Sequence, residues 1–350
     1  MRTRRIESRA IAKIFDARAN PEDRYSNDNR LYVEKRMKVL VTGGAGFIGS
    51  HLVDRLTIDK NQVTVFDDLS SGRIEFIKQH INRSGFRLIQ ADLLDLDEIK
   101  RAMDGHDVVF HFAANPDARL GTERTDLDLK QETLVTYNVL ESMRLNGVKK
   151  IVFSSSGTIY GETPVIPLSE DYGPVLPISL YGAGKLASEG LISAFCHTFN
   201  MQAWILRFAN IVGNRMTHGV IFDFINKLKR NPRELEILGD GTQTKPYLHV
   251  KDCVDGVIFA FRDSHDRVNV FNLGCSTETD VNTIARMVVR EMGLEDVRFR
   301  YSGGNRGWPG DIPQVRFNVD KICRLGWKPK YTSDEAVREA IRELLRKDWR

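Results

Sequence analysis

A strand that runs directly into a glycine-rich turn constrains this chain more than any other feature. Residues 38–42 form a short apolar run, Gly43, Gly46 and Gly49 follow it, and a helical pattern begins there. Glycine lets the backbone turn tightly and approach a pyrophosphate, whose charge then lies among the unpaired N–H groups of the helix N-terminus. The turn alone is equally consistent with a structural role, but its place between a strand and a helix favours a dinucleotide site.

Strand-like and helical segments alternate after this turn. The helical segments at residues 129–146 and 181–199 have a period of 3.6 residues and are long enough to cross between parallel strands. The alternation therefore predicts an α/β fold, a doubly wound parallel sheet of the Rossmann type with helices on both faces. The strand-like runs are residues 62–66, 87–90, 107–112, 150–154 and 203–208.

The chain is predicted to have three parts. Residues 1–36 are a charged extension, and residues 37–209 form the NAD-binding Rossmann domain. Beyond residue 210 the alternation becomes irregular, with helical patterns at 221–230 and 333–347. Residues 210–350 are expected to form mainly a smaller, interleaved α/β domain that binds the substrate. A part of this segment, from about residue 245 to 275, is expected to return to the Rossmann domain.

Charge and cysteine content exclude several classes of protein. The net charge of +4 lies entirely in residues 1–36, which hold ten Lys and Arg against six Asp and Glu. The nearly neutral remainder lacks the basic surface of a protein that binds nucleic acid or a membrane. The four cysteines are scattered, so we expect neither a disulfide framework nor a metal site, and a cytoplasmic location fits best. No stretch is long and apolar enough to span a membrane.

Acidic residues at strand ends indicate which cofactor the turn binds. Asp67 ends the second strand-like run, where a carboxylate accepts hydrogen bonds from the adenosine ribose and repels a 2′-phosphate. NAD is therefore favoured over NADP. The alternative interpretation is that Asp67 and Asp68 only begin the turn that follows this strand. Asp92 ends the third run and is placed at the adenine edge, and an N-cap for a helix over residues 93–99 is a comparable interpretation.

A tyrosine and a lysine mark the expected catalytic helix. Tyr181 and Lys185 are four residues apart, so they share one helix face. A free tyrosine has a pKa of about 10, and a base that works near neutral pH needs a shift of about three units. Lys185 and a nicotinamide charge are able to supply that shift. The pair alone is a common pattern, but Ser156 ends a predicted strand at the same edge of the sheet and favours a catalytic role.

Further motifs extend these patterns over most of the chain. They are TGGAGFIG, HFAA, SSSGTIYG, LRFANIVG, YLHVKD and RGWPGD, which occur in this order between residues 37 and about 329. With Asp67, Tyr181 and Lys185 the chain resembles the NAD-dependent epimerase/dehydratase family of extended short-chain dehydrogenases/reductases, and within it the UDP-glucose 4-epimerases.

The resemblance implies a role for each motif. Tyr181 is the acid/base, Lys185 holds the cofactor ribose and lowers the pKa of Tyr181, and Ser156 hydrogen-bonds the sugar oxygen. We expect NAD to contact Gly43, Gly46, Phe47, Ile48, Gly49, Asp67, Asp68, Leu69, Ser71, Gly72, Asp92, Leu93, Phe112, Ala113, Ala114, Ser154, Tyr181, Lys185 and Phe208. We expect the nucleotide sugar to contact Ser156, Asn210, Val220, Lys245, Tyr247, Arg306, Asp311 and Val315.

The implied reaction is a transient oxidation at C4 of the sugar, with hydride returned to the opposite face. A 4,6-dehydratase or a decarboxylase is the alternative enzyme, and an NAD-binding sensor or scaffold is the alternative without catalysis. Dehydratases of the family carry an Asp-Glu pair after the catalytic hydroxyl residue. Here Gly157 and Thr158 stand there, which favours the epimerase because neither moves a proton as a carboxylate does. An intact set of Tyr181, Lys185 and Ser156 argues against a sensor.

The resemblance also implies a homodimer through the two long helices, with Ala194, Phe195 and Leu140 as candidate contacts. The substrate loops depart from the family pattern in two places. Lys245 and Pro246 replace a usual Arg and Asp, and Gly219 replaces a usual Asn, so the sugar and phosphate contacts are expected to differ.

Two residues near these departures have open roles. His218 lies in the loop of residues 215–219. The sequence is about equally consistent with a substrate contact by His218 and with a loop that only joins two elements. Val315 falls where hexose-restricted relatives place a bulky Tyr, so we expect room for an N-acetyl group at C2 of the sugar. A structural valine that faces the core is an equally open interpretation.

The charged extension yields the first prediction. Because residues 1–36 lack the apolar pattern of a packed segment, a protein that begins at Met37 should keep its melting temperature and turnover nearly unchanged. Thermal unfolding and activity assays of the truncated and full-length proteins make the comparison. A large loss of either would show that the extension packs on the enzyme.

Overall fold

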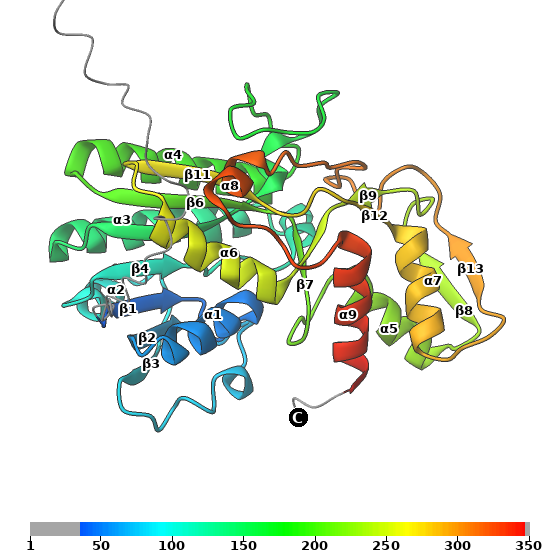
Figure 1. Cartoon of the computed structure of the whole chain (residues 1–350), viewed down its shortest axis with the longest axis horizontal. Coiled ribbons are helices and arrows are strands. Elements are labelled where there is room, and N and C mark those ends of the chain that lie inside the picture. The colour runs from blue at the N-terminus through cyan, green and yellow to red at the C-terminus, as the bar shows by residue number, and fades with distance from the viewer. Residues whose placement is uncertain (1–35, 347–350) are drawn as a thin grey trace, which may run out of the picture. The chain divides into compact units, whose positions relative to one another are not determined.

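The computed structural model describes residues 36–346 and places a seven-stranded parallel sheet at the centre of that part of the chain (Figure 1). The strand order is β11-β6-β5-β4-β1-β2-β3, and every neighbouring pair is parallel. The predicted doubly wound fold is therefore confirmed. The strands are β1 (Lys38–Thr42), β2 (Gln62–Asp67), β3 (Phe86–Gln90), β4 (Val108–His111), β5 (Lys150–Ser156), β6 (Gln202–Phe208) and β11 (Val268–Leu273).

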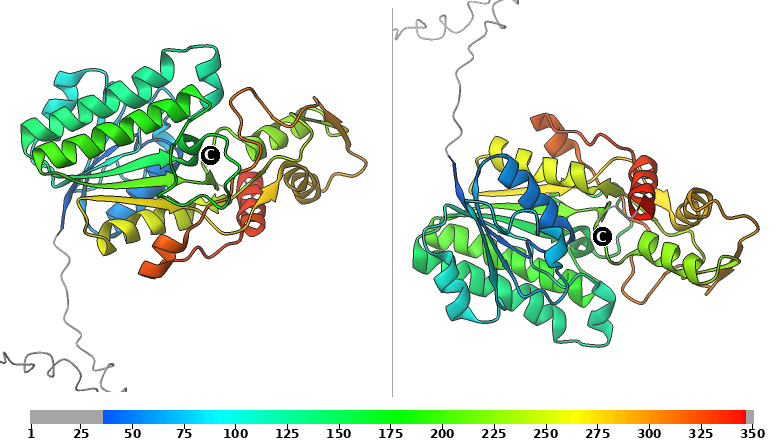
Figure 2. Two further views of the ribbon diagram at one scale, coloured as in Figure 1. Left: turned by 90° about the horizontal axis from the view of Figure 1, so that it is seen from above. Right: turned by 90° about the horizontal axis from the view of Figure 1, so that it is seen from below.

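Helices cover both faces of this sheet (Figure 2). In β1, Val39 and Val41 pack into the core on one face, whereas Leu40 packs into the core on the other, because successive strand residues point to opposite sides. One face carries α1 (Phe47–Ile58), α6 (Val250–Asp263) and α8 (Asp320–Leu325). The other carries α2 (Leu96–Met103), α3 (Val135–Asn146) and α4 (Leu180–Phe199).

The C-terminal part of the described chain builds a smaller region with its own core, around Phe224, Ile284 and Ile341. Three two-stranded sheets and three helices form it, and the chain returns from it to the main sheet to add α6 and β11. The helices are α5 (Val220–Arg230), α7 (Val281–Glu291) and α9 (Ser333–Arg346). The strand pairs are β7 (Asn210–Val212) with β10 (Tyr247–His249), β9 (Thr244–Lys245) with β12 (Thr279–Asp280), and β8 (Glu234–Ile237) with β13 (Arg298–Tyr301).

The structure differs from the sequence-based expectations at two helix starts. Asp92 does not cap a helix, because α2 begins only at Leu96 and its cap is Asp95, whose side chain accepts from the Asp97 and Glu98 N–H groups. The segment predicted as one helix over residues 129–146 begins with a π-helical turn, η4 (Leu129–Leu134), before α3 continues it. The predicted extension, apart from residue 36, lies outside the described residues.

The strand order reverses at β1, which pairs with β2 on one side and β4 on the other. In open parallel sheets such a reversal leaves a crevice at the carboxyl ends of the strands, and ligands bind there. None of the helices within residues 36–346 is long and apolar enough to span a membrane.

Candidate functional site

A pocket of about 560 Å³ lies at the carboxyl edge of the sheet. The ends of the strands line it on one side, and segments of the C-terminal region line it on the other. All of the cofactor and substrate residues predicted from the sequence line it except Leu69 and Arg306. Arg306 instead donates to the Asp311 carbonyl at 2.8 Å and to Glu162 at 2.6 Å.

The glycine turn packs too closely to tolerate side chains. Gly43 has a φ of +67°, and a Cβ there would lie 2.6 Å from the Ala113 nitrogen. A Cβ on Gly49 would collide with the Gly43 carbonyl oxygen. Helix α1 then begins after Gly46 without any side-chain hydrogen bond at its N-cap, so its first N–H groups are available to an anion in the pocket.

Asp67 is buried beside this turn and ties it to the next loop. Its Oδ2 accepts from the Ala45 N–H at 2.8 Å and its Oδ1 from the Leu69 N–H at 2.9 Å, so Leu69 supports the aspartate from behind. Burial raises the pKa of Asp67, and the two N–H donors oppose that rise. Each carboxylate oxygen keeps a second lone pair, which a ligand hydroxyl in the pocket is able to use. A Cβ on Gly72 would lie 2.6 Å from Oδ1.

Ser156, Tyr181 and Lys185 meet where β5 ends and α4 begins. The Lys185 ammonium donates to the Ser154 carbonyl at 2.8 Å and lies 5.7 Å from the centre of the Tyr181 ring. Burial raises the pKa of Tyr181, the charges of Glu132 and Asp128 raise it further, and a hydrogen bond with Ser156 lowers it. The role of Lys185 in lowering the pKa of Tyr181 stays a prediction.

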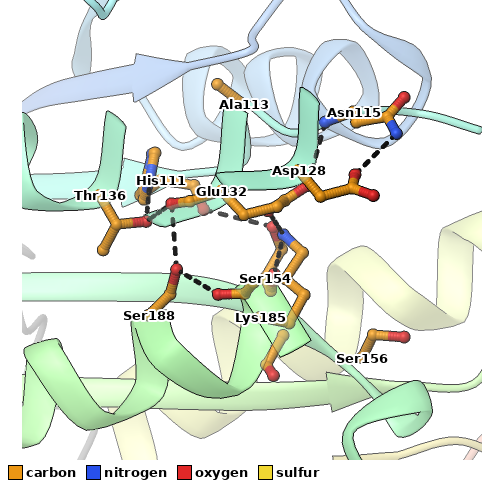
Figure 3. Close-up of polar contacts among 12 residues, drawn as sticks. His111, Ala113, Asn115, Asp128, Glu132, Thr136, Ser154, Ser156, Lys185 and Ser188 are labelled. Carbon is orange, nitrogen blue, oxygen red and sulfur yellow. Dashed lines mark hydrogen bonds and ion pairs between the residues drawn. The ribbon is translucent and has the colours of Figure 1, made fainter. Parts of the chain in front are cut away.

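Two buried carboxyl groups, Glu132 and Asp128, lie behind Lys185, and neither was predicted from the sequence as a site residue (Figure 3). Glu132 lies 2.9 Å from the Lys185 ammonium, and its Oε1 accepts from the Asn115 N–H at 3.0 Å. Asp128 accepts from the Asn115 side chain at 2.8 Å. Glu132 had one available signal, because the helical period of residues 129–146 places it on the apolar face with Val135.

The end of the pocket away from the glycine turn contains paired charges. Arg119 binds Asp117 at 2.7 Å and lies 3.6 Å from Asp223, and Lys245 forms an ion pair with Asp311. His218 lines the pocket, and burial lowers its pKa, so it is neutral near pH 7. Gly219 has a φ of +92°, a conformation that favours glycine.

A second buried network supports the strand that carries Ser156. The Ser155 hydroxyl donates to Glu189 at 2.5 Å, and Arg207 binds both carboxylate oxygens of Glu189 at 3.1 and 2.9 Å. Arg207 also donates to the Tyr160 hydroxyl at 2.9 Å. These contacts fix β5 and β6 relative to α4, so the backbone around Ser154 and Ser156 is held in place.

Comparison with known proteins agrees with this geometry. Residues 39–274 match the NAD dependent epimerase/dehydratase family. The chain is similar to the UDP-glucose 4-epimerase of Mycolicibacterium smegmatis, with 32% identity over 87% of this chain and 97% of the relative. A crystal structure of a UDP-galactose 4-epimerase is 40% identical with a TM-score of 0.80, over 89% of this chain and all of the other. The Thermus thermophilus UDP-glucose 4-epimerase in complex with NAD is 30% identical with a TM-score of 0.79, over 89% and 100%.

Proposed function

Because the chain belongs to the NAD-dependent epimerase/dehydratase family, we propose that it inverts the C4 centre of a UDP-linked hexose with NAD in the pocket. The observation that carries this proposal is the convergence of the glycine turn, Asp67 and the Ser156–Tyr181–Lys185 group on one pocket. When bound, NAD supplies the group that accepts hydride from the sugar and gives it back.

The residues present fit NAD. The pyrophosphate would lie at the open N-terminus of α1, where Gly46 lines the pocket without a side chain. The free lone pairs of Asp67 would accept the hydroxyls of the adenosine ribose, and Asp92 would border the adenine. Lys185 would reach the nicotinamide ribose, because its ammonium is held beside the Ser154 carbonyl on the same pocket wall.

The chain's own side chains would handle the sugar proton. Tyr181 would remove the proton from the C4 hydroxyl and later return it, and Ser156 would hydrogen-bond the same oxygen. Asn210 lines the pocket where it would contact the diphosphate. Thr158 donates to the Ser156 hydroxyl at 3.0 Å and so orients it.

Steric and charge arguments favour epimerisation over elimination. A Cβ on Gly157 would collide with the Phe317 ring, so this backbone has no room for an acidic side chain at that position. Asp117, Asp223 and Asp311 at the sugar end are each beside a cation. The extra acid and base that a 4,6-dehydratase needs are therefore missing at the expected place.

A panel of UDP-sugars tests the function directly. UDP-galactose should convert to UDP-glucose without net reduction, as followed by NMR, and Tyr181→Phe should lower kcat by about a hundredfold or more. Tyr172→Phe, outside the pocket, is the matched control. A 4-keto-6-deoxy product would instead indicate a dehydratase, and a pentose product would indicate a decarboxylase. No turnover at all would indicate an NAD-binding sensor.

Cofactor choice should depend on Asp67. Replacing it with Ala removes a carboxylate that would bind the ribose and repel a 2′-phosphate, so NAD affinity should fall about tenfold or more while discrimination against NADP relaxes. Calorimetry with both cofactors makes the measurement. Asp97→Ala removes an exposed carboxylate outside the pocket and should change neither affinity. Equal binding of NAD and NADP by the unaltered protein would contradict the assignment.

Sugar tolerance should depend on Val315, which lines the pocket and also packs against the core. We propose that its small side chain leaves room for an N-acetyl group at C2, so that both UDP-glucose and UDP-N-acetylglucosamine are substrates. Val315→Tyr should reduce kcat/KM for the N-acetylated sugar selectively. If the ratio of the two kcat/KM values does not change, Val315 is a structural residue.

We also propose a cytoplasmic homodimer. The outer sides of η4, α3 and α4 expose large apolar residues. The ring of Tyr137 on α3 packs edge-on against the ring of Phe195 on α4, with 6.4 Å between the ring centroids. Leu140, a candidate from the sequence, is fully buried in the core and cannot be part of this surface, whereas Ala194 is exposed. The four cysteines are free, which fits a reducing compartment. The exposed apolar residues are Leu129, Leu134, Tyr137, Leu145 and Phe199.

A charge placed on this surface should separate the subunits. Tyr137→Glu should give a monomer by light scattering at micromolar concentration, because an isologous interface meets the new charge twice. Ile58→Glu, at an apolar residue on α1 that is 73% exposed, should leave the dimer intact. A monomeric unaltered protein would rule out the interface.

A further inference from the structure

The carboxyl group of Glu132 is almost completely buried, at 1% exposure, and it reaches the catalytic helix from behind. It does not line the pocket. One oxygen accepts from the Asn115 N–H at 3.0 Å, and the other lies 2.9 Å from the Lys185 ammonium. A charge this deep is costly unless it is paired, and Lys185 is the cation that pairs it.

The local backbone is built around this contact. Glu132 lies in the π-helical turn η4, and such turns are frequent at functional sites. Helix α4 approaches η4 so closely that a Cβ on Gly184 would lie 2.8 Å from the Cβ of Glu132. The Glu132 carbonyl accepts from the hydroxyls of Thr136 at 2.5 Å and Ser188 at 3.0 Å, which anchors the turn to both helices (Figure 3).

Four other titratable groups face Glu132 from the surrounding elements. They are Lys185 and Tyr181 on α4, Asp128 just before η4, and His111 on β4. His111 is linked to Glu132 through the Thr136 hydroxyl, which hydrogen-bonds both the His111 ring and the Glu132 carbonyl. Burial lowers the pKa of His111 to about 3, so His111 is neutral near pH 7. Lys185 is therefore the cation of this group, and it is shared between a phenol and two carboxyls.

The state of Glu132 is finely balanced. Burial and the charge of Asp128 raise its pKa, the Lys185 ammonium and the Asn115 N–H lower it, and together they leave it at about 7. When ionised, Glu132 raises the pKa of Tyr181. Protonation of Glu132 near neutral pH would leave the Lys185 charge unmatched, and a phenolate would then be stabilised beside it.

We propose that Glu132 is a positioning residue: its carboxylate holds the Lys185 ammonium against the Ser154 carbonyl and controls how readily Tyr181 gives up its proton. Glu132 acts through Lys185 and touches neither sugar nor cofactor. The kinetic consequence rests on the proposed epimerase function, whereas the effect on the phenol does not.

The pH profile of the holoenzyme tests the kinetic consequence. Tyr181 must be ionised to accept a proton, so kcat/KM falls as the pH drops below its pKa. Glu132→Gln removes the negative charge that Glu132 carries when ionised and lowers the pKa of Tyr181. Because native Glu132 is itself partly protonated near pH 7, the acid limb of kcat/KM should move to lower pH by up to about one unit. Glu132→Asp keeps the charge and should keep the limb near its original place.

A matched control separates this effect from lost stability. Glu189→Gln also removes a buried carboxylate from an ion pair, here with Arg207 on the far side of β5. It should lower the melting temperature as Glu132→Gln does, yet leave the acid limb unmoved. If Glu132→Gln does not fold, Glu132→Asn is the second neutral variant, because its shorter side chain leaves room for a water between Lys185 and Asn115.

NMR of the holoenzyme labelled with ¹³C at the phenolic carbon of tyrosine tests the proposal without any substrate. Comparison with Tyr181→Phe assigns the signal, and its titration should shift to lower pH in the neutral Glu132 variants. A folded neutral variant with an unchanged Tyr181 titration would overturn the proposal. A shifted titration in a protein without epimerase activity would support the role of Glu132 and contradict the proposed reaction instead.

Discussion

Parallel hydrogen bonding in the central sheet brings the carboxyl ends of its strands to one edge, and the strand-end side of the candidate site depends on this arrangement. Gly43 follows β1, Asp67 ends β2, Ala113 follows β4 and Ser156 ends β5. These residues are far apart in sequence and meet because β1 pairs with β2 and β4, and β4 pairs with β5. Gly43 also lies so close to the Ala113 backbone that a Cβ there would collide with it.

Buried charges divide the site into two networks with different consequences. Arg207 and Glu189 satisfy each other through two hydrogen bonds, so this pair serves to hold β5 and β6 against α4. Lys185 is instead shared among the Ser154 carbonyl, Glu132 and the face of Tyr181. In our proposal its charge cannot stabilise a Tyr181 phenolate fully while Glu132 is ionised, so that a residue outside the pocket influences a phenol inside it.

The choice between reactions within the family depends on packing as well as on sequence. Gly157 and Thr158 stand where the family resemblance places the acidic pair of a dehydratase. The structure adds the reason why no simple substitution would restore that pair, because the Phe317 ring fills the space next to Gly157. Phe317 comes from a segment more than a hundred residues away, so local sequence does not contain this constraint.

The sequence by itself determined the parallel sheet, the glycine turn and the residues at the strand ends, because these follow from local periodicity and backbone chemistry. It also predicted that Tyr181 and Lys185 share a helix face, since four residues are about one helical turn. Only the tertiary structure decided what stands opposite that face. Glu132 reaches Lys185 through the packing of η4 against α4, and Asn115 hydrogen-bonds both Glu132 and Asp128 beside that contact. Burial and charge pairing depend on contacts between distant segments, and residue spacing along the chain does not encode them.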